Sequence, residues 1–238
     1  MTERKAPKTA LVLAGGKGER LRPLTDDRPK PMVEAAGTPI LVHHLRWLRD
    51  NGIERAVVLT GYLHEVVAAY FSTPQIDGLT VECIAEKQPL GRGGAFRNGF
   101  TQAGITDDLL VATNGDVITD QPLAEMLELH QRANALATLL LVQMVSPYGV
   151  VDVDDAGVVK SFVEKPTLPL WINGGVYLVD ATVFARFPEV GDHETSTFPA
   201  LAEEGRIAAL KSTAYWTSVE SAKDLREVVE KLAAAAGA

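Results

Sequence analysis

The chain has 238 residues, 46% of them hydrophobic, and is therefore long enough to bury one substantial core. Its formal net charge of −8 argues against a general nucleic-acid binder, which would carry a basic excess. No apolar run reaches the ~18 residues of a membrane span, and the start MTERKAPK lacks the apolar region of a secretion signal. We therefore expect a cytoplasmic protein with neither nucleic acid nor membrane as a partner.

Strand-like and helix-like segments alternate along most of the chain. Apolar runs predict strands at 9–13, 56–60, 79–85, 109–112 and 136–145. Amphipathic stretches between them predict helices at 39–50, 64–71, 94–103 and 123–132. The later residues predict short strands at 149–153, 158–164, 175–179 and 208–211, and helices near 198–204 and from 221 onward. This pattern indicates an α/β fold with a Rossmann-like, mostly parallel sheet, helices on both faces, and ligands at the carboxyl ends of the strands.

The first predicted strand leads into a glycine-rich turn that is followed by cations. The turn holds Gly15, Gly16 and Gly18, which allow a sharp bend with N–H groups pointing at a ligand. The cations within the next positions are Lys17, Arg20, Arg22, Arg28 and Lys30. Pro29 and Pro31 stiffen the backbone around Lys30. The spacing is neither a Walker A loop nor a complete Rossmann fingerprint, but the cations favour a phosphate-binding loop over an ordinary turn.

A second turn with side chains that could bind a ligand, Asn114-Gly115-Asp116, follows the predicted strand LLVAT. A carboxylate at the end of a central parallel strand faces the ligand crevice, and one carboxylate with substrate phosphates is the usual way of holding Mg²⁺. For such a residue alone, a helix cap or a turn is the alternative. Together with a phosphate-binding loop on the first strand, the turn favours metal binding by Asp116.

The string GGKGERLRPLTDDRPKPM, from Gly15 to Met32, resembles the signature of the sugar-phosphate nucleotidylyltransferases, also called nucleotide-sugar pyrophosphorylases, whose pattern is GGxGxRLxPLTxxxPKP. The match has no gap, and later segments are most similar to guanylyltransferases of heptose 1-phosphate or mannose 1-phosphate. The resemblance extends from about residue 9 to about residue 233. It implies a single nucleotidyltransferase domain, 1–238, with a nucleotide-binding part at about 9–120 and a sugar-phosphate-binding part at about 121–238.

The resemblance implies transfer of a nucleotidyl group from a nucleoside triphosphate to a sugar 1-phosphate, with release of pyrophosphate and with Mg²⁺ as cofactor. In-line attack on the α-phosphorus needs mainly alignment and charge neutralisation, because the nucleophile is already anionic. We expect Arg20 and Lys17 to hold the β- and γ-phosphates and Lys30 the α-phosphate region. Asp116 matches the magnesium aspartate of the family. The backbone that should contact the nucleotide belongs to Ala14, Gly15, Gly16 and Gly18.

The segment EKQPLGRGGA, from Glu86 to Ala95, resembles the PLGxGGA loop of the family, which lies beside the base and ribose. Its glycines suit close approach to a planar ligand, and we expect Pro89 and Gly91 to contact the nucleotide together with Glu86. A carboxylate only accepts hydrogen bonds, so Glu86 would take both donors on the guanine edge but would meet a lone pair on adenine N1. The sequence thus favours GTP. An exposed Glu86 without a ligand role stays open, as does a uridylyl- or thymidylyltransferase, since uracil N3–H could also donate.

Three short elements resemble the sugar-phosphate site of the family: Tyr148-Gly149-Val150-Val151, Glu164-Lys165-Pro166 and Asn173-Gly174-Gly175. In the family the lysine contacts the 1-phosphate, while the glutamate, the asparagine and nearby backbone groups bind sugar hydroxyls. The resemblance implies these roles for Lys165, Glu164, Asn173 and the backbone at Gly149, with Asn114 beside them. Taken singly, each is equally consistent with an ordinary surface residue.

One motif departs from the family pattern. The second metal aspartate of the family lies in a late W-x-D-x-G-x motif, which corresponds here to Trp216-Thr217-Ser218-Val219-Glu220-Ser221. Ser218 takes the place of the aspartate, and a hydroxyl is a neutral, weaker ligand. Glu220 is the alternative, but as a strand residue it would lie about 7 Å further along the same face. The substitution leaves open a nucleotide- or sugar-sensing module without catalysis, and a homo-oligomer is open as well.

Overall fold

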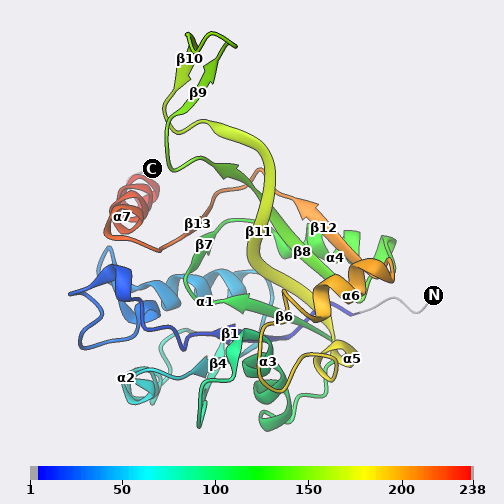
Figure 1. Ribbon diagram of the computed structural model, residues 1–238. Helices are drawn as coiled ribbons and strands as arrows, with labels where there is room; N and C mark the ends of the chain where they lie inside the picture. Colours follow the sequence, from blue (N-terminus) through cyan, green and yellow to red (C-terminus); the bar gives the residue numbers. More distant parts are fainter. Residues whose placement is uncertain (1–4, 237–238) are drawn as a thin grey trace.

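The computed structural model describes residues 5–236 and centres on a seven-stranded sheet (Figure 1). Across the sheet the strands follow the order β12 (Ile207–Lys211), β8 (Ala137–Val145), β11 (Thr167–Asp180), β6 (Leu109–Asn114), β1 (Thr9–Leu13), β4 (Arg55–Thr60) and β5 (Thr80–Ala85). The pairs β6–β1, β1–β4, β4–β5 and β8–β12 are parallel, whereas β11 runs antiparallel to both β6 and β8. The predicted α/β fold with a mostly parallel sheet is confirmed.

Helices cover both faces of the sheet, because successive strand residues point to opposite sides. In β1, Ala10 and Val12 pack in one hydrophobic cluster and Leu11 in another. The first cluster includes apolar residues of α1 (Ile40–Asp50), α2 (His64–Tyr70) and α4 (Leu123–Arg132). The second includes those of α3 (Gly91–Gln102), α5 (Ala181–Phe184) and α6 (Thr197–Glu203). Burial on both faces is the reason why these strands are continuous apolar runs in the sequence.

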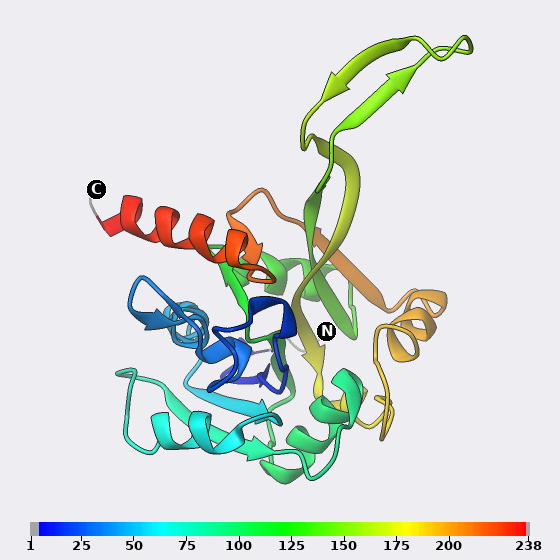
Figure 2. The same cartoon turned by 60° about the vertical axis from the view of Figure 1, so that its left-hand side comes forward.

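A smaller ribbon brings the C-terminal helix to the carboxyl end of β6. Strand β7 (Val117–Thr119) pairs antiparallel with β13 (Trp216–Ser218). Helix α7 (Ala222–Ala236) follows and contributes Val228 to a third hydrophobic cluster, which also includes Leu21 and Ile118. The first and last parts of the chain therefore lie side by side, as the blue and red segments of Figures 1 and 2 show.

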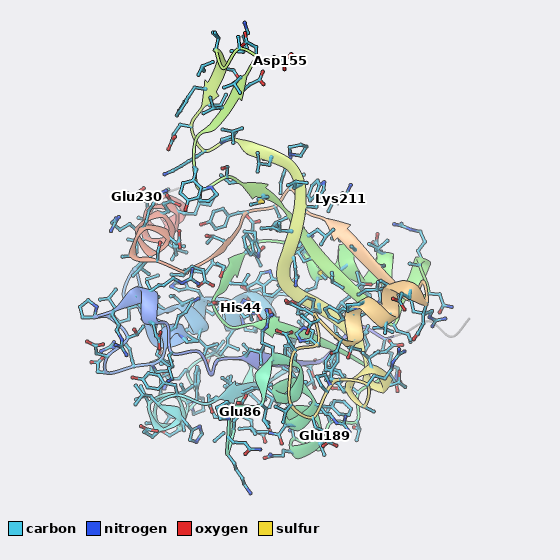
Figure 3. The ribbon with its side chains drawn as sticks, in the orientation of Figure 1. His44, Glu86, Asp155, Glu189, Lys211 and Glu230 are labelled. Carbon is cyan, nitrogen blue, oxygen red and sulfur yellow. The ribbon has the colours of Figure 1, made fainter. Side chains whose placement is uncertain are left out.

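Strands β8 and β11 lead into a hairpin that projects from the body, formed by β9 (Val150–Val153) and β10 (Val159–Val163) (Figures 1 and 2). A backbone hydrogen bond from the N–H of Ser146 to the carbonyl of Pro166, 3.0 Å long, closes its base. Every residue of both strands is exposed. The tip, marked by Asp155 in Figure 3, lies far from Glu86, which belongs to the body.

Some boundaries and short elements differ from the sequence-based expectation. Strand β11 begins at Thr167 and not near 175, because its first half is largely exposed and lacks an apolar signal. Helix α3 begins at Gly91 and not at 94, since its first turn is rich in glycine, a weak helix former. Further elements are too short for periodicity to predict: β2 (Glu34–Ala35), β3 (Thr38–Pro39), β7, β13, α5, and the 3₁₀ turns Glu19–Leu21 and Lys30–Met32. Within residues 5–236, no helix combines the length and apolar character that crossing a membrane requires.

Candidate active site

A cavity of about 490 Å³ lies at the carboxyl ends of β1 and β6, where an α/β sheet places its ligands. Eight of the residues expected from the sequence line it: Gly15, Gly16, Gly18, Arg20, Lys30, Asn114, Asp116 and Glu220. The sequence reasoning did not single out the other lining residues, Leu13, Glu19, Pro31 and Arg92, as site residues. The glycine-rich segment, the turn after β6 and the start of α7 therefore meet at one site.

Gly18 lets the Lys30 side chain pass close to the glycine-rich turn. Its φ of +64° lies in the left-handed region, and a Cβ at this position would stand 2.6 Å from Cβ of Lys30. The Thr25 hydroxyl donates to the Gly18 carbonyl at 3.0 Å and closes the turn. Lys30 begins a 3₁₀ turn after Pro29 and is only 8% exposed. The glycine is thus required for packing of the lysine as well as for bending of the loop.

The Lys30 ammonium bridges two carboxylates. Its Nζ lies 2.6 Å from Oδ2 of Asp116 and 2.9 Å from Oε1 of Glu220. Arg20 pairs with Glu220 through the other carboxylate oxygen, Oε2. A buried ammonium needs such partners, because an unpaired buried charge is costly. An anionic ligand in this cavity would meet three cations, since Arg92 also lines it, together with three carboxylates that repel it, since Glu19 lines it as well.

Glu220, and not Ser218, reaches the wall of the cavity. Strand β13 ends at Ser218, so the expectation that Glu220 is a strand residue is wrong and strand spacing does not apply to it. The Glu220 carboxylate turns back and accepts a hydrogen bond from Ser218 Oγ at 3.2 Å. The carboxylate of Asp224 accepts from the Glu220 backbone N–H at 3.0 Å, which fixes the start of α7.

Asp116 and Glu220 are the groups that fit a divalent cation. Oδ1 of Asp116 is buried without a hydrogen-bond partner, and such an oxygen is normally satisfied by a ligand. The position of Lys30 shows that a single cation can contact both carboxylates. Within residues 5–236, no group of three or more histidine, cysteine or acidic side chains is arranged to hold a metal ion. A divalent cation would therefore complete its shell from substrate phosphates and water, as Mg²⁺ usually does.

Two of the five cations in the glycine-rich segment line the cavity, and the other three do not. Lys17 is exposed to solvent. Arg22 and Arg28 form ion pairs with aspartates that are close to them in sequence. Ala14 is buried, and its backbone N–H donates to β4 at 2.8 Å, which anchors the turn to the sheet. The glycine-rich segment therefore contributes two cations to the cavity, fewer than the sequence indicates.

Glu86 lies at the same edge of the sheet as the cavity but does not line it. It follows β5, two strands from β1, a lateral distance of about 10 Å at the usual strand spacing. Its Oε2 accepts a hydrogen bond from the backbone N–H of Leu90 at 3.2 Å. Burial raises the pKa of the Glu86 carboxyl, and the Leu90 hydrogen bond opposes that rise. In Figure 3 the Glu86 side chain is seen in the lower part of the body.

The glycines after Glu86 contact the protein itself. A Cβ at Gly91 would lie 2.6 Å from the carbonyl oxygen of Gly191, and one at Gly93 would lie 2.7 Å from the backbone nitrogen of His193. The Gly93 N–H also donates to the Gly191 carbonyl at 3.0 Å. The close approach that these glycines permit is thus between α3 and segment 188–193. Pro89 and Gly91 do not line the cavity, and their contact with a nucleotide stays a prediction.

Two of the expected sugar-side elements lie at the base of the hairpin, outside the wall of the cavity. A Cβ at Gly149 would stand 2.9 Å from Oε2 of Glu164, so these two residues are neighbours. Lys165 follows with a left-handed φ of +49° and is exposed. The ammonium of Lys223, on α7, lowers the pKa of Lys165. At the hairpin base, Lys165 therefore lies near α7, and Gly149 and Glu164 lie beside each other.

The third element, at Asn173, is connected to the cavity by residues that the sequence reasoning missed. Asn173 Nδ2 donates to Glu194 Oε1 at 2.8 Å. Glu194 pairs with Arg92, which lines the cavity, at a distance of 2.8 Å between Oε2 and Nη2. Arg92 could have been noticed as a cation in the variable position of the PLGxGGA loop. Glu194 belongs to no motif in the sequence, and only the fold brings it to Asn173.

A glycine-rich turn, lysine and arginine side chains and an aspartate meet at the carboxyl ends of parallel strands, an arrangement typical of proteins that bind ligands with phosphate groups. Residues 9–235 match the family model described as Nucleotidyl transferase. The chain therefore belongs to the nucleotidyl transferase family.

Named relatives and solved structures are consistent with this family. The chain is 36% identical over 223 residues to the mannose-1-phosphate guanylyltransferase of Mycobacterium tuberculosis, covering 90% of the chain and 62% of that protein. It is 30% identical over 239 residues to a probable glucose-1-phosphate cytidylyltransferase of Bacillus subtilis, covering 92% and 94%. HddC from Yersinia pseudotuberculosis has a TM-score of 0.75 at 26% identity, covering 94% of the chain and 99% of HddC, and has also been crystallised with GMP-PN. The chain spans about 60% of the length of the guanylyltransferases it matches.

Proposed function

We propose that the protein is a sugar-1-phosphate nucleotidylyltransferase that prefers GTP and takes a mannose- or heptose-like sugar 1-phosphate as acceptor. The observation that carries the proposal is the buried Lys30, which is fixed beside Arg20 and Asp116 at the wall of the cavity. Family membership supports nucleotidyl transfer. The relative from M. tuberculosis is named for mannose 1-phosphate and guanylyl transfer, and HddC has been crystallised with GMP-PN, which supports these substrates.

The reaction that fits this site is an in-line displacement at the α-phosphorus. An oxygen of the sugar 1-phosphate forms a bond to the α-phosphorus while the bond from that phosphorus to the bridging oxygen breaks. The electron pair leaves with pyrophosphate, and no proton has to move because the nucleophile is an anion. Lys30 and Arg20, which line the cavity, neutralise charge on the phosphates, assisted by the N–H groups of the glycine-rich turn, while the exposed Lys17 would reach the β- and γ-phosphates from outside the cavity wall. One such fixed contact contributes roughly 2.7 to 4 kcal/mol to lowering a barrier.

Mg²⁺ is the cofactor that we propose, with Asp116 and Glu220 as its protein ligands. When bound, it would neutralise phosphate oxygens and stabilise the pyrophosphate that leaves. Without a cation, the two carboxylates would repel the triphosphate that Lys30 and Arg20 attract. Ser218 does not replace the missing aspartate in this proposal; its hydroxyl holds the Glu220 carboxylate in place.

Glu86 is the residue that we propose to select the base. Its carboxylate is already fixed by the Leu90 N–H, and it lies to the side of the phosphate-binding turn at the same sheet edge. A carboxylate there accepts from guanine N1–H and N2–H₂, whereas adenine N1 offers no donor. On the acceptor side, we propose that Lys165 contacts the sugar 1-phosphate, and that Glu164, Asn173 and the backbone at Gly149 contact hydroxyls. Asn114 would lie between the two substrates.

Pyrophosphate release by the purified protein tests the function. The protein is incubated with mannose 1-phosphate or heptose 1-phosphate and, in turn, with GTP, ATP, UTP, CTP or dTTP. We expect GTP to be favoured by about 5- to 150-fold in kcat/KM, the equivalent of one unpaired buried polar group. Glu86→Gln should reduce this preference, because an amide donates as well as accepts.

The matched control is Glu82→Gln. It also removes one negative charge, but Glu82 lies on β5 and its carboxylate is paired with Arg55. Preference for UTP or dTTP, or an unchanged ranking in Glu86→Gln, would contradict the role of Glu86. Stoichiometric binding of GTP without pyrophosphate release from any pair would contradict catalysis and favour a sensing module.

A further inference from the structure

A charged network joins α3, β11 and segment 191–196 beside the cavity. Arg92 donates from Nε to Oδ2 of Asp192 at 2.8 Å and from Nη1 to Oε1 of Glu194 at 3.0 Å. The same Glu194 oxygen accepts from the Tyr177 hydroxyl at 2.9 Å and from Asn173 Nδ2 at 2.8 Å. Glu194 is therefore the residue at which the cation on the cavity wall and the amide on β11 meet.

Segment 191–196 is fixed on both sides of Glu194. The N–H of Gly191 donates to the carbonyl of Leu90 at 2.7 Å, next to the start of α3. His193 is fully buried, and its ring packs against the rings of Phe96 and Phe198. Because its neighbours are held by backbone bonds and aromatic packing, the Glu194 carboxylate is pre-organised.

Glu194 determines which end of the Asn173 amide faces a ligand. The Asn173 amide nitrogen donates toward both the Glu194 carboxylate and the Tyr177 hydroxyl, each at 2.8 Å. The amide oxygen accepts from the Gly175 N–H at 3.0 Å and keeps one lone pair. A carboxylate only accepts hydrogen bonds, so Glu194 requires Asn173 to direct its NH₂ toward it. Asn173 can then present its amide oxygen to a ligand hydroxyl, while its NH₂ group faces Glu194 and Tyr177.

This amide lies next to the cavity. Gly175 is two residues from Asn173 on β11, and a Cβ on Gly175 would stand 2.5 Å from Nδ2 of Asn114, which lines the cavity. Arg92 lines the same cavity and forms the other end of the network. The network thus extends from Arg92, which lines the cavity, to the β11 segment that contacts Asn114, which also lines it.

We propose that Glu194 is a positioning residue that sets specificity for the acceptor sugar. It fixes the polarity of the Asn173 amide, so that this side of the site accepts a hydrogen bond from a sugar hydroxyl, and it holds Arg92 at the wall. This inference rests on the proposed function, since it concerns the acceptor of that reaction.

Glu194→Gln tests the proposal, with Glu189→Gln as the matched control. A glutamine side chain presents an N–H to either Arg92 or Asn173 and loses one of these contacts. Glu189 belongs to the neighbouring segment, is labelled near α3 in Figure 3, and is 85% exposed in its side chain, with Arg97 at 3.6 Å. Thermal melting shows whether each variant folds. Isothermal titration gives the Kd of mannose 1-phosphate, and pyrophosphate release gives KM for mannose 1-phosphate and for GTP separately.

We expect the Kd and KM for mannose 1-phosphate to rise about tenfold in Glu194→Gln, the loss of roughly one hydrogen bond to a charged group, with KM for GTP and the control unchanged. In an Asn173→Ala background, Glu194→Gln should add little, because the residue acts through Asn173. An unchanged Kd, an equal rise in KM for GTP, or a full additional loss in that background would overturn the proposal. Weaker binding in Glu194→Gln without pyrophosphate from any protein would support the positioning role while refuting the proposed reaction. Pyrophosphate release with an unchanged Kd in Glu194→Gln would support the proposed reaction and refute the positioning role. If the wild type does not bind mannose 1-phosphate, both proposals are overturned.

Discussion

The buried charge of Lys30 shows how single residues organise the site. The motif around Lys30 and the turn at Asp116 are evident in the sequence, and the structure brings the two within 2.6 Å. The place of Glu220 could not be predicted in the same way, because it depends on the residue at which β13 ends. Lys30 binds both carboxylates, so any metal ion in the site would share these carboxylates with the lysine.

A measurement of metal affinity tests whether Asp116 and Glu220 are the carboxylates that bind the cation. We expect Asp116→Asn and Glu220→Gln each to weaken Mn²⁺ binding about tenfold, or ~1.4 kcal/mol, because each removes a charged oxygen ligand. Ser218→Asp should strengthen it by adding a carboxylate beside Glu220. Paramagnetic resonance of free Mn²⁺ gives these affinities without turnover. Glu227→Gln is the control, since Glu227 pairs with Lys223 on the exposed side of α7, and unchanged affinity in the first two variants would contradict the ligand assignment.

His193 gives the structure a dependence on pH. Burial lowers the pKa of His193 from 6.5 to about 4, and its ring nitrogens have no hydrogen-bond partners. Between these values the unfolded chain binds a proton that the native protein does not, so stability is complete above about pH 6.5 and falls as the pH falls toward 4. From pH 7 to pH 5.5 this single group costs about 1 kcal/mol of unfolding free energy.

We therefore expect the unfolding free energy of His193→Phe to fall by about 1 kcal/mol less than that of the wild type between pH 7 and pH 5.5. A phenylalanine suits the site, because the aromatic neighbours of His193 include Phe96, Phe187 and Phe198. Urea unfolding at pH 7 and pH 5.5 measures the difference. Burial also lowers the pKa of His44 to about 4, so the variant should keep part of the dependence. Identical slopes for the two proteins would exclude His193 as a contributor.

Among the elements, the hairpin departs most from the usual relation between apolar sequence and burial. Its valines predict strands correctly through their preference for extended backbone. Yet Val151 and Phe162, which lie opposite each other, are 43% and 65% exposed. The sequence pattern specifies that these strands form, but it does not specify whether anything covers them, because coverage depends on the bend of β11 away from the body.

Removal of the hairpin should separate folding from acceptor binding. Replacing residues 147–165 by a short glycine-serine turn removes strands that bury nothing against the body. We expect the melting temperature to change by no more than about 2–4 °C, the equivalent of ~1 kcal/mol. GTP binding should persist, and turnover should be lost because Gly149, Glu164 and Lys165 are removed. A large fall in melting temperature would contradict this prediction and would indicate that the hairpin is packed against another molecule in solution.

At the scale of the whole molecule, the sequence allowed prediction of those features that depend on residues close together in the chain. Hydrophobic periodicity placed the main strands and helices, and the glycine-rich motif pointed to the edge of the sheet where the cavity lies. Contacts between distant segments lay beyond such patterns. Arg20 pairs with Glu220, 200 residues later, and Asn173 on β11 pairs with Glu194 in the segment between α5 and α6. The antiparallel insertion of β11 between β6 and β8 was likewise not encoded in any local signal.

Because the cavity joins both ends of the chain, ligand binding should stabilise the whole molecule. A ligand at 100 times its Kd adds about 2.7 kcal/mol of stability, which raises the melting temperature of a domain of this size by roughly 5–10 °C. We expect this rise for GTP with MgCl₂ and a smaller one for GTP with EDTA, since Asp116 and Glu220 then face the phosphates without a cation. ATP with MgCl₂ at the same concentration should give a smaller rise, because it offers Glu86 no pair of donors. Fluorescence-monitored melting measures all three. Equal rises with and without Mg²⁺ would contradict the metal site, and equal rises for ATP and GTP would contradict selection of the base by Glu86.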